Sequence, residues 1–380
     1  MLKQALSVLT IMTAGAGLAL GQDAINAASR LPTPSYGASN AYDLPAMPSV
    51  RSSPYGNYQT TTLTADGSTA IATPPSTGTG CAACGQSAAQ CCMHGWFDVD
   101  YLMMFPSRMS VPVVLNTAAG APLAGNSPDL GISHGVRFNT GLWLHDGQLA
   151  VQGIIFGNFR SEVINTQPAG TIPVNTGVAV TNFTYDSWHQ LAGAEVNGLY
   201  RLIDNSATKV YFIGGGRYVN LEEDLTMRYS IGTLNFIDDF HSRNQFGGPQ
   251  IGAMLTHRAG PFDMDVTAKV ALGVNYAQLY VLGLNTSTGA GANNVQAFTQ
   301  ASNIGTYSSS FFAVIPELNA NLRYRMTEHL SLNVGYDFMM STNNWRAGNQ
   351  VTTTFPPVIA PPIRSTYYIN GFTAGFSVNY

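Results

Sequence analysis

The most constraining feature of this sequence is a two-residue alternation between apolar and polar side chains, which recurs from Trp96 to the last residue. It is clearest over residues 262–276, where the apolar positions are Phe262, Met264, Val266, Ala268, Val270, Leu272, Val274 and Tyr276. Successive side chains of a β-strand point to opposite faces, so this period predicts strands with one apolar and one polar face. A water-soluble sandwich would alternate in the same way, and other features must separate the two cases.

Composition favours a lipid-facing surface. Charged residues make up only 10% of the sequence, against about 25% in a typical soluble domain. Hydrophobic residues reach 45%, yet no internal apolar run approaches the roughly 20 residues of a membrane-spanning helix. A barrel in a bilayer spreads its apolar surface over alternate positions, which explains low charge without long apolar runs. The formal net charge of −4 offers nucleic acid no basic surface.

The lengths of the connections support the same interpretation. Alternation and turn residues predict ten strands, at residues 96–105, 135–144, 149–159, 189–201, 209–220, 245–255, 262–276, 312–325, 330–340 and 367–380. Long connections alternate with short turns that begin at His145, Asp204, His257 and Thr327. Outer-membrane barrels have short periplasmic turns and long outer loops, whereas a Greek-key sandwich has no reason for this asymmetry. We therefore predict an all-β fold, a single up-and-down antiparallel transmembrane β-barrel of about ten strands over residues 96–380.

The N-terminal part is expected to lie outside this barrel. Residues 1–21 have a lysine, an apolar stretch and small residues near Gly21, which predicts a cleaved secretory signal peptide. A membrane anchor is disfavoured because the stretch is short and is interrupted by Ser7, Thr10 and Thr13. Residues 22–95 are rich in Ala, Ser, Thr, Pro and Gly and lack apolar periodicity, so we expect a disordered periplasmic linker.

The last eight residues predict both a strand and a destination. Phe372, Ala374, Phe376, Val378 and Tyr380 share one face, and the strand is expected to close the barrel against residues 96–105. Four residues have the spacing of Thr373, Gly375, Val378 and Tyr380. This spacing resembles the C-terminal signal that the outer-membrane assembly machinery reads. We expect the protein in the cell outer membrane, with lipid and that machinery as partners.

Four cysteines precede the first predicted strand: Cys81, Cys84, Cys91 and Cys92, with His94 nearby. A zinc cluster is one interpretation, but adjacent Cys91 and Cys92 are an awkward way to supply two separated ligand pairs. In an oxidising periplasm disulfides are the simpler outcome, with a pairing that the sequence leaves open. Bridges to other envelope proteins are a further alternative. We expect no metal and no cofactor.

Charged side chains on the polar faces are expected to point into the barrel lumen: Asp98, Arg137, Glu195, Arg217, Lys269, Glu317, Arg323 and Asp337. A barrel of about eight strands is just filled by its side chains, so one of about ten should be narrow. The lumen could then be a constriction that selects small solutes. The favoured alternative is a polar core closed by ion pairs, such as Arg217 with Glu195 or Glu317.

Three further features carry weaker hypotheses. Asp239-Phe240-His241 resembles the D-x-H dyad at the rim of omptin proteases, but a facing pair of aspartates is not evident, and we expect no catalytic residue. Glu222-Glu223-Asp224 could bind a cation, although a solvated loop is favoured. Five aromatic residues near predicted strand ends are candidates for the interfacial girdles: Tyr101, Tyr218, Tyr276, Trp345 and Tyr380.

The order of several motifs resembles the putative beta-barrel porin family seven, outer-membrane barrels best represented in planctomycetes. The motifs are Trp96-Phe-Asp-Val-Asp-Tyr-Leu, Leu191-Ala-Gly-Ala-Glu-Val-Asn, Gly214-Gly-Gly-Arg-Tyr-Val, Phe240-His-Ser-Arg-Asn-Gln-Phe-Gly-Gly, Ala268-Lys-Val-Ala-Leu-Gly, Asn303-Ile-Gly-Thr-Tyr, Phe312-Ala-Val-Ile-Pro-Glu-Leu and Gly335-Tyr-Asp-Phe. The resemblance implies a porin-like passage for small solutes rather than an enzyme. The alternative is a non-conducting structural or surface-binding envelope barrel that acts through its long outer loops, and a rim protease is a weaker third.

Overall fold

A computed structural model describes residues 94–125, 129–144, 147–173, 177–285, 297–300, 302–354 and 362–380. The predicted signal peptide, nearly all of the predicted linker and the four cysteines lie outside these residues. The described residues contain β-strands and one short 3-10 helix, η1 (Ala347–Gln350). None of the described helical structure is long and apolar enough to span a bilayer.

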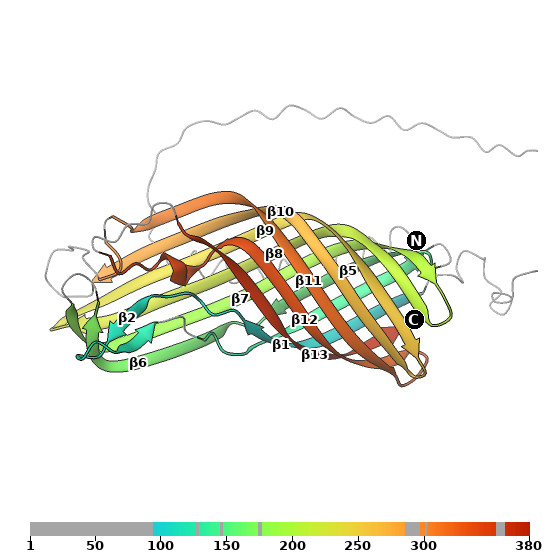
Figure 1. Cartoon of the computed structure of the whole chain (residues 1–380), viewed down its shortest axis with the longest axis horizontal. Helices are drawn as coiled ribbons and strands as arrows, with labels where there is room; N and C mark the ends of the chain where they lie inside the picture. The colour runs from blue at the N-terminus through green and yellow to red at the C-terminus, as the bar shows by residue number, and fades with distance from the viewer. Residues whose placement is uncertain are drawn as a thin grey trace, which may run out of the picture. The chain divides into compact units, whose positions relative to one another are not determined.

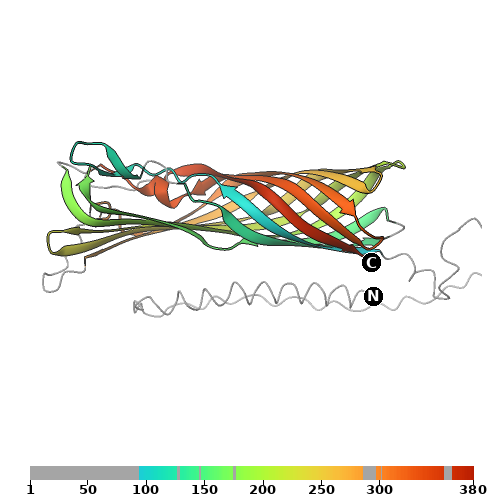
Figure 2. The same cartoon turned by 90° about the horizontal axis from the view of Figure 1, so that it is seen from below.

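Ten antiparallel strands form a closed ring. Figures 1 and 2 show the barrel that this ring makes. In ring order they are β1 (Gly95–Pro106), β4 (Ser133–Leu144), β5 (Leu149–Asn158), β7 (Val178–Asp204), β8 (Thr208–Ile231), β9 (Leu234–Ala259), β10 (Phe262–Asn285), β11 (Gly305–Arg325), β12 (Leu330–Trp345) and β13 (Arg364–Asn379). β13 closes the ring by pairing with β1, from Trp96 opposite Asn379 to Pro106 opposite Ile369. The predicted up-and-down barrel of ten strands is confirmed, and so is the pairing of its last strand with its first.

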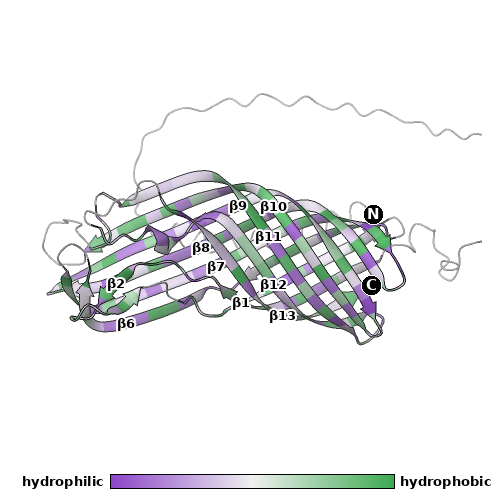
Figure 3. Ribbon diagram, in the orientation of Figure 1, coloured by the Kyte–Doolittle hydropathy of each residue, from purple (hydrophilic) through white to green (hydrophobic). Residues whose placement is uncertain are grey.

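The outer surface follows the alternation read from the sequence. Phe372 and Phe376 of β13 are exposed, and so is Tyr380 directly after it, whereas Thr373 and Ser377 point into the interior and are buried. Figure 3 shows the resulting alternation of hydrophobic and hydrophilic residues along the strands. A surface of exposed apolar side chains is stable in lipid and would be a liability in water.

Four of the five aromatic residues proposed for the girdles are exposed: Tyr101, Tyr218, Tyr276 and Tyr380. The proposal was wrong for Trp345, which is buried and packs edge-on against Phe311 with ring centroids 5.4 Å apart. Trp345 lies beyond the bulge between Ser341 and Asn344 of β12. Its ring belongs to an interior cluster, so proximity to a strand end did not indicate which face it takes.

Several strands are longer than the sequence predicted. β7, with 27 residues, and β8, β9 and β10, with 24 to 26, exceed the roughly 9 to 11 residues that cross a bilayer. We expected a long connection between the predicted strands 209–220 and 245–255, and this was wrong. Residues 221–244 are almost entirely strand and turn only at Gly232 and Thr233. Beyond the lipid the outward face no longer needs to be apolar, so the alternation that reveals a membrane strand disappears there.

Three additional strands occur in segments that we predicted as loops. They are β2 (Val113–Asn116), β3 (Pro122–Gly125) and β6 (Ser161–Ile172). β6 pairs with the outer part of β7, from Ser161 opposite His189 to Ile172 opposite Val178. β5 pairs with the inner part of the same strand. The wall therefore continues outward past the membrane as a sheet rather than as loops.

Candidate functional site

The structure places all eight predicted lumen charges in the barrel interior. Four of them meet across the lumen: Glu195 of β7, Arg217 of β8, Lys269 of β10 and Glu317 of β11. The Arg217 guanidinium contacts both glutamates. The Lys269 ammonium lies 2.8 Å from Glu195 and 3.0 Å from Glu317. Each charge of this interior network therefore touches two groups of opposite sign, which is how buried charges offset their lost hydration.

Strand register explains how the network forms. Arg217 lies directly opposite Glu195, and Lys269 directly opposite Glu317. β9 runs between the two cations and carries Gly248 opposite Arg217 and Gly252 opposite Lys269. A side chain at Gly252 would approach the Lys269 stem to 2.8 Å. Gly252 therefore leaves the space that the Lys269 side chain occupies on its way to Glu195.

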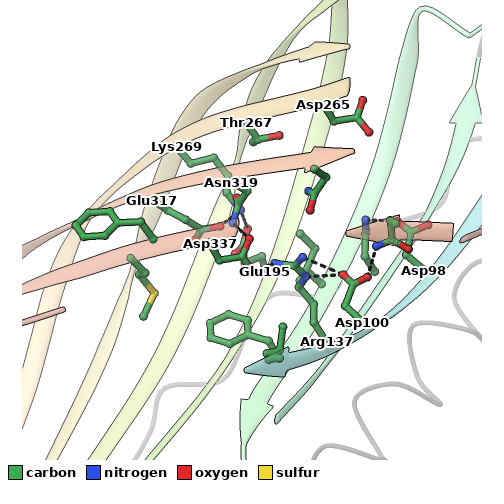
Figure 4. A pocket seen from close by; sticks show the side chains of 18 of the residues that line it. Asp98, Asp100, Arg137, Glu195, Asp265, Thr267, Lys269, Glu317, Asn319 and Asp337 are labelled. Atoms are coloured by element: carbon green, nitrogen blue, oxygen red, sulfur yellow. Dashed lines mark hydrogen bonds and ion pairs between the residues drawn. The ribbon is translucent and has the colours of Figure 1, made fainter. Parts of the chain in front are cut away.

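A second group of charges surrounds Arg137 of β4. Its guanidinium lies 2.9 Å from Asp100 of β1 and 2.6 Å from Asp337 of β12. Asn319 donates a hydrogen bond of 2.8 Å to Asp337. Figure 4 shows this second group together with Glu195, Lys269 and Glu317 of the first, on side chains that converge from several strands.

The other two predicted charges lie nearby. Asp98 accepts a hydrogen bond of 2.8 Å from Asn139, and Arg323 lies 3.3 Å from Asp265. Three more carboxylates on interior-facing positions were not predicted: Asp100, Asp263 and Asp265. Asp100 lies an even number of residues from Asp98, and Asp263 and Asp265 lie an even number from Lys269. The two-residue period of a strand therefore places them on the same interior face, and they could have been predicted from the sequence.

Apolar clusters bound the charged region on both sides. Toward the periplasmic turns, Trp143 packs between Trp96 and Tyr211, with ring centroids 5.5 Å and 5.3 Å away. Toward the outer end lies a larger cluster: Leu102, Met104, Leu191, Val219, Leu221, Phe246, Ala271, Ala313, Ile315, Met339, Tyr367 and Ile369. A cavity of about 140 Å³ lies in the charged region and is lined by seven of the eight predicted charges, all except Arg217. Space for several water molecules remains there.

The predicted solvated loop 222–224 is wrong, because these residues belong to β8 and alternate between its faces. Glu223 is fully buried and forms a two-point ion pair with Arg346, with a closest distance of 2.6 Å. Arg346 also donates 3.0 Å hydrogen bonds to the hydroxyl and the carbonyl of Ser107. Glu222 and Asp224 face outward and pair with Arg243 and His241. No group of three or more metal-ligating side chains is found among the described residues.

The candidate protease dyad, Asp239 and His241, lies on the outward face of β9. The alternate residues, Asp238 and Phe240, face the interior and are fully buried. His241 lies 3.4 Å from Asp224 and stacks between Trp188 and Tyr280. Burial and the nearby Asp224 carboxylate raise the pKa of Asp239 to about 6. Neither residue lines the interior cavity.

Comparison with protein families decides the identity of this barrel. The family model described as Putative beta barrel porin-7 matches residues 96–380. The chain belongs to this family. The resemblance read from the motifs is thereby confirmed, and the porin-7 barrel is an outer-membrane β-barrel.

Solved structures resemble the porin-7 barrel only distantly. The outer membrane protease OmpT from Escherichia coli is 11% identical, with a TM-score of 0.46, and the match covers 76% of this chain and 96% of that chain. Ail of Yersinia pestis is 7% identical, with a TM-score of 0.24 and coverage of 76% and 98%. The Pseudomonas putida toluene transporter TodX is 8% identical, with a TM-score of 0.22 and coverage of 76% and 89%. None of these values supports an argument about function, and no curated protein matches the sequence.

Proposed function

We propose that the porin-7 barrel is a closed, non-conducting envelope barrel that presents its outer part at the cell surface. The observation that carries this proposal is the interior network of Glu195, Arg217, Lys269 and Glu317, which spans the lumen from four strands. Leaving one member of a buried ion pair without its partner costs about 3 to 5 kcal/mol. The network therefore resists the side-chain movements that an open passage would need.

The apolar clusters on either side of the network support closure as well. A hydrated ion would have to cross the Trp96, Trp143 and Tyr211 rings and then the Leu221 and Phe246 region, losing its water in both. Uncompensated burial of a charge in apolar surroundings is strongly unfavourable. Open aqueous channels generally need about 16 strands, whereas this ring has ten.

The outer part gives the closed barrel its proposed role. More than half of each of the strands β7 to β10 lies beyond the length that a bilayer needs. This extension has its own apolar core, which includes Phe183, Tyr229, Phe240 and Phe298. A folded extension of this kind favours a role in binding at the cell surface over transport through the lumen.

Conductance in planar bilayers tests the proposal. The wild-type protein should give no sustained ion current over repeated insertions. The variant Glu195→Ala/Arg217→Ala/Lys269→Ala/Glu317→Ala removes two charges of each sign and should leak ions more readily, provided that it folds. The matched control Glu222→Ala/Arg243→Ala removes an outward ion pair and should stay silent, since surface pairs contribute little to the barrel.

Steady unitary currents from the wild-type protein would contradict closure and would favour the rival function, a passage for small solutes through the charged cavity. A silent four-residue variant that is correctly folded would mean that the two apolar clusters close the lumen without help from the network.

A further inference from the structure

A second cavity, of about 600 Å³, lies in the barrel wall and not in the lumen. Past Pro106 the chain leaves the wall after one more backbone hydrogen bond, from Ser107 to Tyr368, of 2.7 Å. β13 continues outward from there toward Arg364, paired with β12 alone. The resulting gap between the end of β1 and the outer end of β13 is the cavity. We call it the seam cavity.

The seam cavity opens at the level of the outer membrane interface. From Tyr380, directly after β13, back to Phe372, the outward side chains are apolar or small, and Asn370 is the first polar one. About ten residues of a tilted strand cross the bilayer, so a crossing that begins at Tyr380 ends near Asn370. Asn370 lines the seam cavity. An occupant would therefore have its polar end at the interface and could extend an apolar chain into the lipid.

The lining divides into two parts that match such an occupant. Phe105, Ile132 and Tyr368 line the cavity on its lipid side, and Ile132 and Tyr368 are exposed. Six small hydroxyl and amide side chains make up much of the remaining lining: Ser107, Ser110, Asn349, Ser365, Thr366 and Asn370. Neutral groups of this kind exchange hydrogen bonds with hydroxyls.

The charges in the lining are balanced within the protein. Arg346 forms a two-point ion pair with Glu223, and the Arg108 guanidinium lies 3.8 Å from the Asp129 carboxylate. No cation of the described lining lacks a carboxylate neighbour, so the site has little net attraction for a phosphate. A neutral head group fits this balance better.

Two residues of the described lining carry an oxygen atom that lacks a hydrogen-bond donor. Asn349 Oδ1 and Ser365 Oγ are buried, and neither has a hydrogen-bond partner among the described residues. A buried acceptor left unsatisfied destabilises the folded protein. Rotation of either side chain toward the seam cavity would bring Asn349 Oδ1 or Ser365 Oγ within reach of a ligand hydroxyl, which would satisfy it.

We propose that the seam cavity binds one amphiphile of the outer leaflet, with a neutral, hydroxyl-rich head group among the serine and asparagine side chains and an alkyl chain over Phe105 and Tyr368. Sugar-headed lipids belong to this class. The proposal does not depend on whether the lumen conducts.

Native mass spectrometry of the intact protein tests it, with the barrel held in lauryldimethylamine oxide micelles and titrated with dodecyl maltoside. One maltoside should be retained per barrel, with dodecylphosphocholine and free maltose retained much less. The variant Asn349→Ala/Ser365→Ala should bind dodecyl maltoside about tenfold more weakly, because two hydrogen bonds of about 0.5 to 1.5 kcal/mol each are lost. The control Asn165→Ala/Thr166→Ala changes an exposed amide and hydroxyl on β6 and should bind as the wild type does.

If the double variant fails to fold, Ser110→Trp offers a second test. Ser110 is an exposed member of the lining, so a tryptophan there should fill the seam cavity and abolish retention without disturbing the core. Equal retention of dodecyl maltoside and dodecylphosphocholine would overturn the preference for hydroxyls. Unchanged retention by both folded variants would overturn the site itself.

Discussion

At the scale of single residues, the outer part of the barrel depends on one buried carboxylate. Asp238 is fully buried and accepts hydrogen bonds from the Thr299 amide at 3.0 Å, the Phe298 amide at 3.4 Å and the Tyr229 hydroxyl at 2.8 Å. Tyr229 in turn accepts one from the Ala297 amide at 2.7 Å. These bonds hold residues 297–300 inside the outer end of the ring. Asp238 lies well beyond the membrane-spanning part of β9, and burial raises its pKa to about 6.

We expect this carboxyl to make stability fall as pH rises. Because the folded pKa of Asp238 lies above the ordinary 3.8, its contribution is fully present below about pH 4 and is lost as pH rises through about 6. The free energy of unfolding should fall by up to about 3 kcal/mol over this window from this group alone. Asp238→Asn should remove that part of the pH dependence, measured by urea unfolding in micelles.

Asp239→Asn is the matched comparison for this prediction. Its pKa is also raised to about 6, through burial and Asp224, so it should remove a separate part of the slope and leave the part due to Asp238. A slope in Asp238→Asn equal to that of the wild type would show that the Asp238 carboxyl does not titrate as its surroundings imply.

At the scale of elements, β13 is the strand that closes the ring. The backbones of Gly95 and Tyr380 exchange hydrogen bonds of 2.8 and 3.0 Å, and the Tyr380 ring covers Gly95. Gly375 faces the interior so closely that a side chain there would overlap the carbonyl oxygen of Val99. Removing β13 would leave the edges of β1 and β12 unpaired, which a bilayer does not tolerate.

Deletion of residues 364–380 should therefore abolish assembly, and Gly375→Leu should reduce it strongly. Tyr380→Ala should lower the amount of assembled barrel in cells several-fold, if the terminal residues act as the proposed assembly signal. The control Tyr336→Ala alters another exposed, lipid-facing aromatic residue on the adjacent strand. The measurement is the heat-modifiable band on gels of membrane fractions.

Refolding into detergent separates the two possible causes of a Tyr380→Ala defect. A defect seen in cells but absent in purified refolding would support recognition by the assembly machinery. Normal insertion of the variant in cells would count against any signal at this end of the chain.

At the scale of the whole molecule, membership of the porin-7 family and the closed ring lead to a prediction about location. The protein should be recovered in the outer-membrane fraction and should need detergent for extraction, because exposed apolar side chains cover the membrane-level wall. Mass spectrometry of the mature protein should find its N-terminus near Gln22, as the proposed signal peptide requires. A protein that stays in solution after lysis, or that retains residues 1–21, would contradict the respective proposal.

Prediction from sequence worked best where lipid imposes a rule. All ten ring strands were located, because each must alternate apolar and polar side chains as it crosses the bilayer. The same parity placed Glu195, Arg217, Lys269 and Glu317 on interior faces. β2, β3, β6 and the outer halves of β7 to β10 were missed, since outside the bilayer no single rule governs both faces of a strand. Trp345 and Glu223 were misplaced for the same reason.

The sequence by itself determined that this chain forms an outer-membrane barrel with charged residues directed inward, since period-two alternation and low charge follow from a lipid solvent on one side. Only the tertiary structure decided which charges meet. Glu195 and Lys269 lie on strands that are not adjacent, and they touch because ring closure and strand tilt bring them to the same height across a narrow lumen. The seam cavity has the same origin, because it exists only where β1 ends before β13 does.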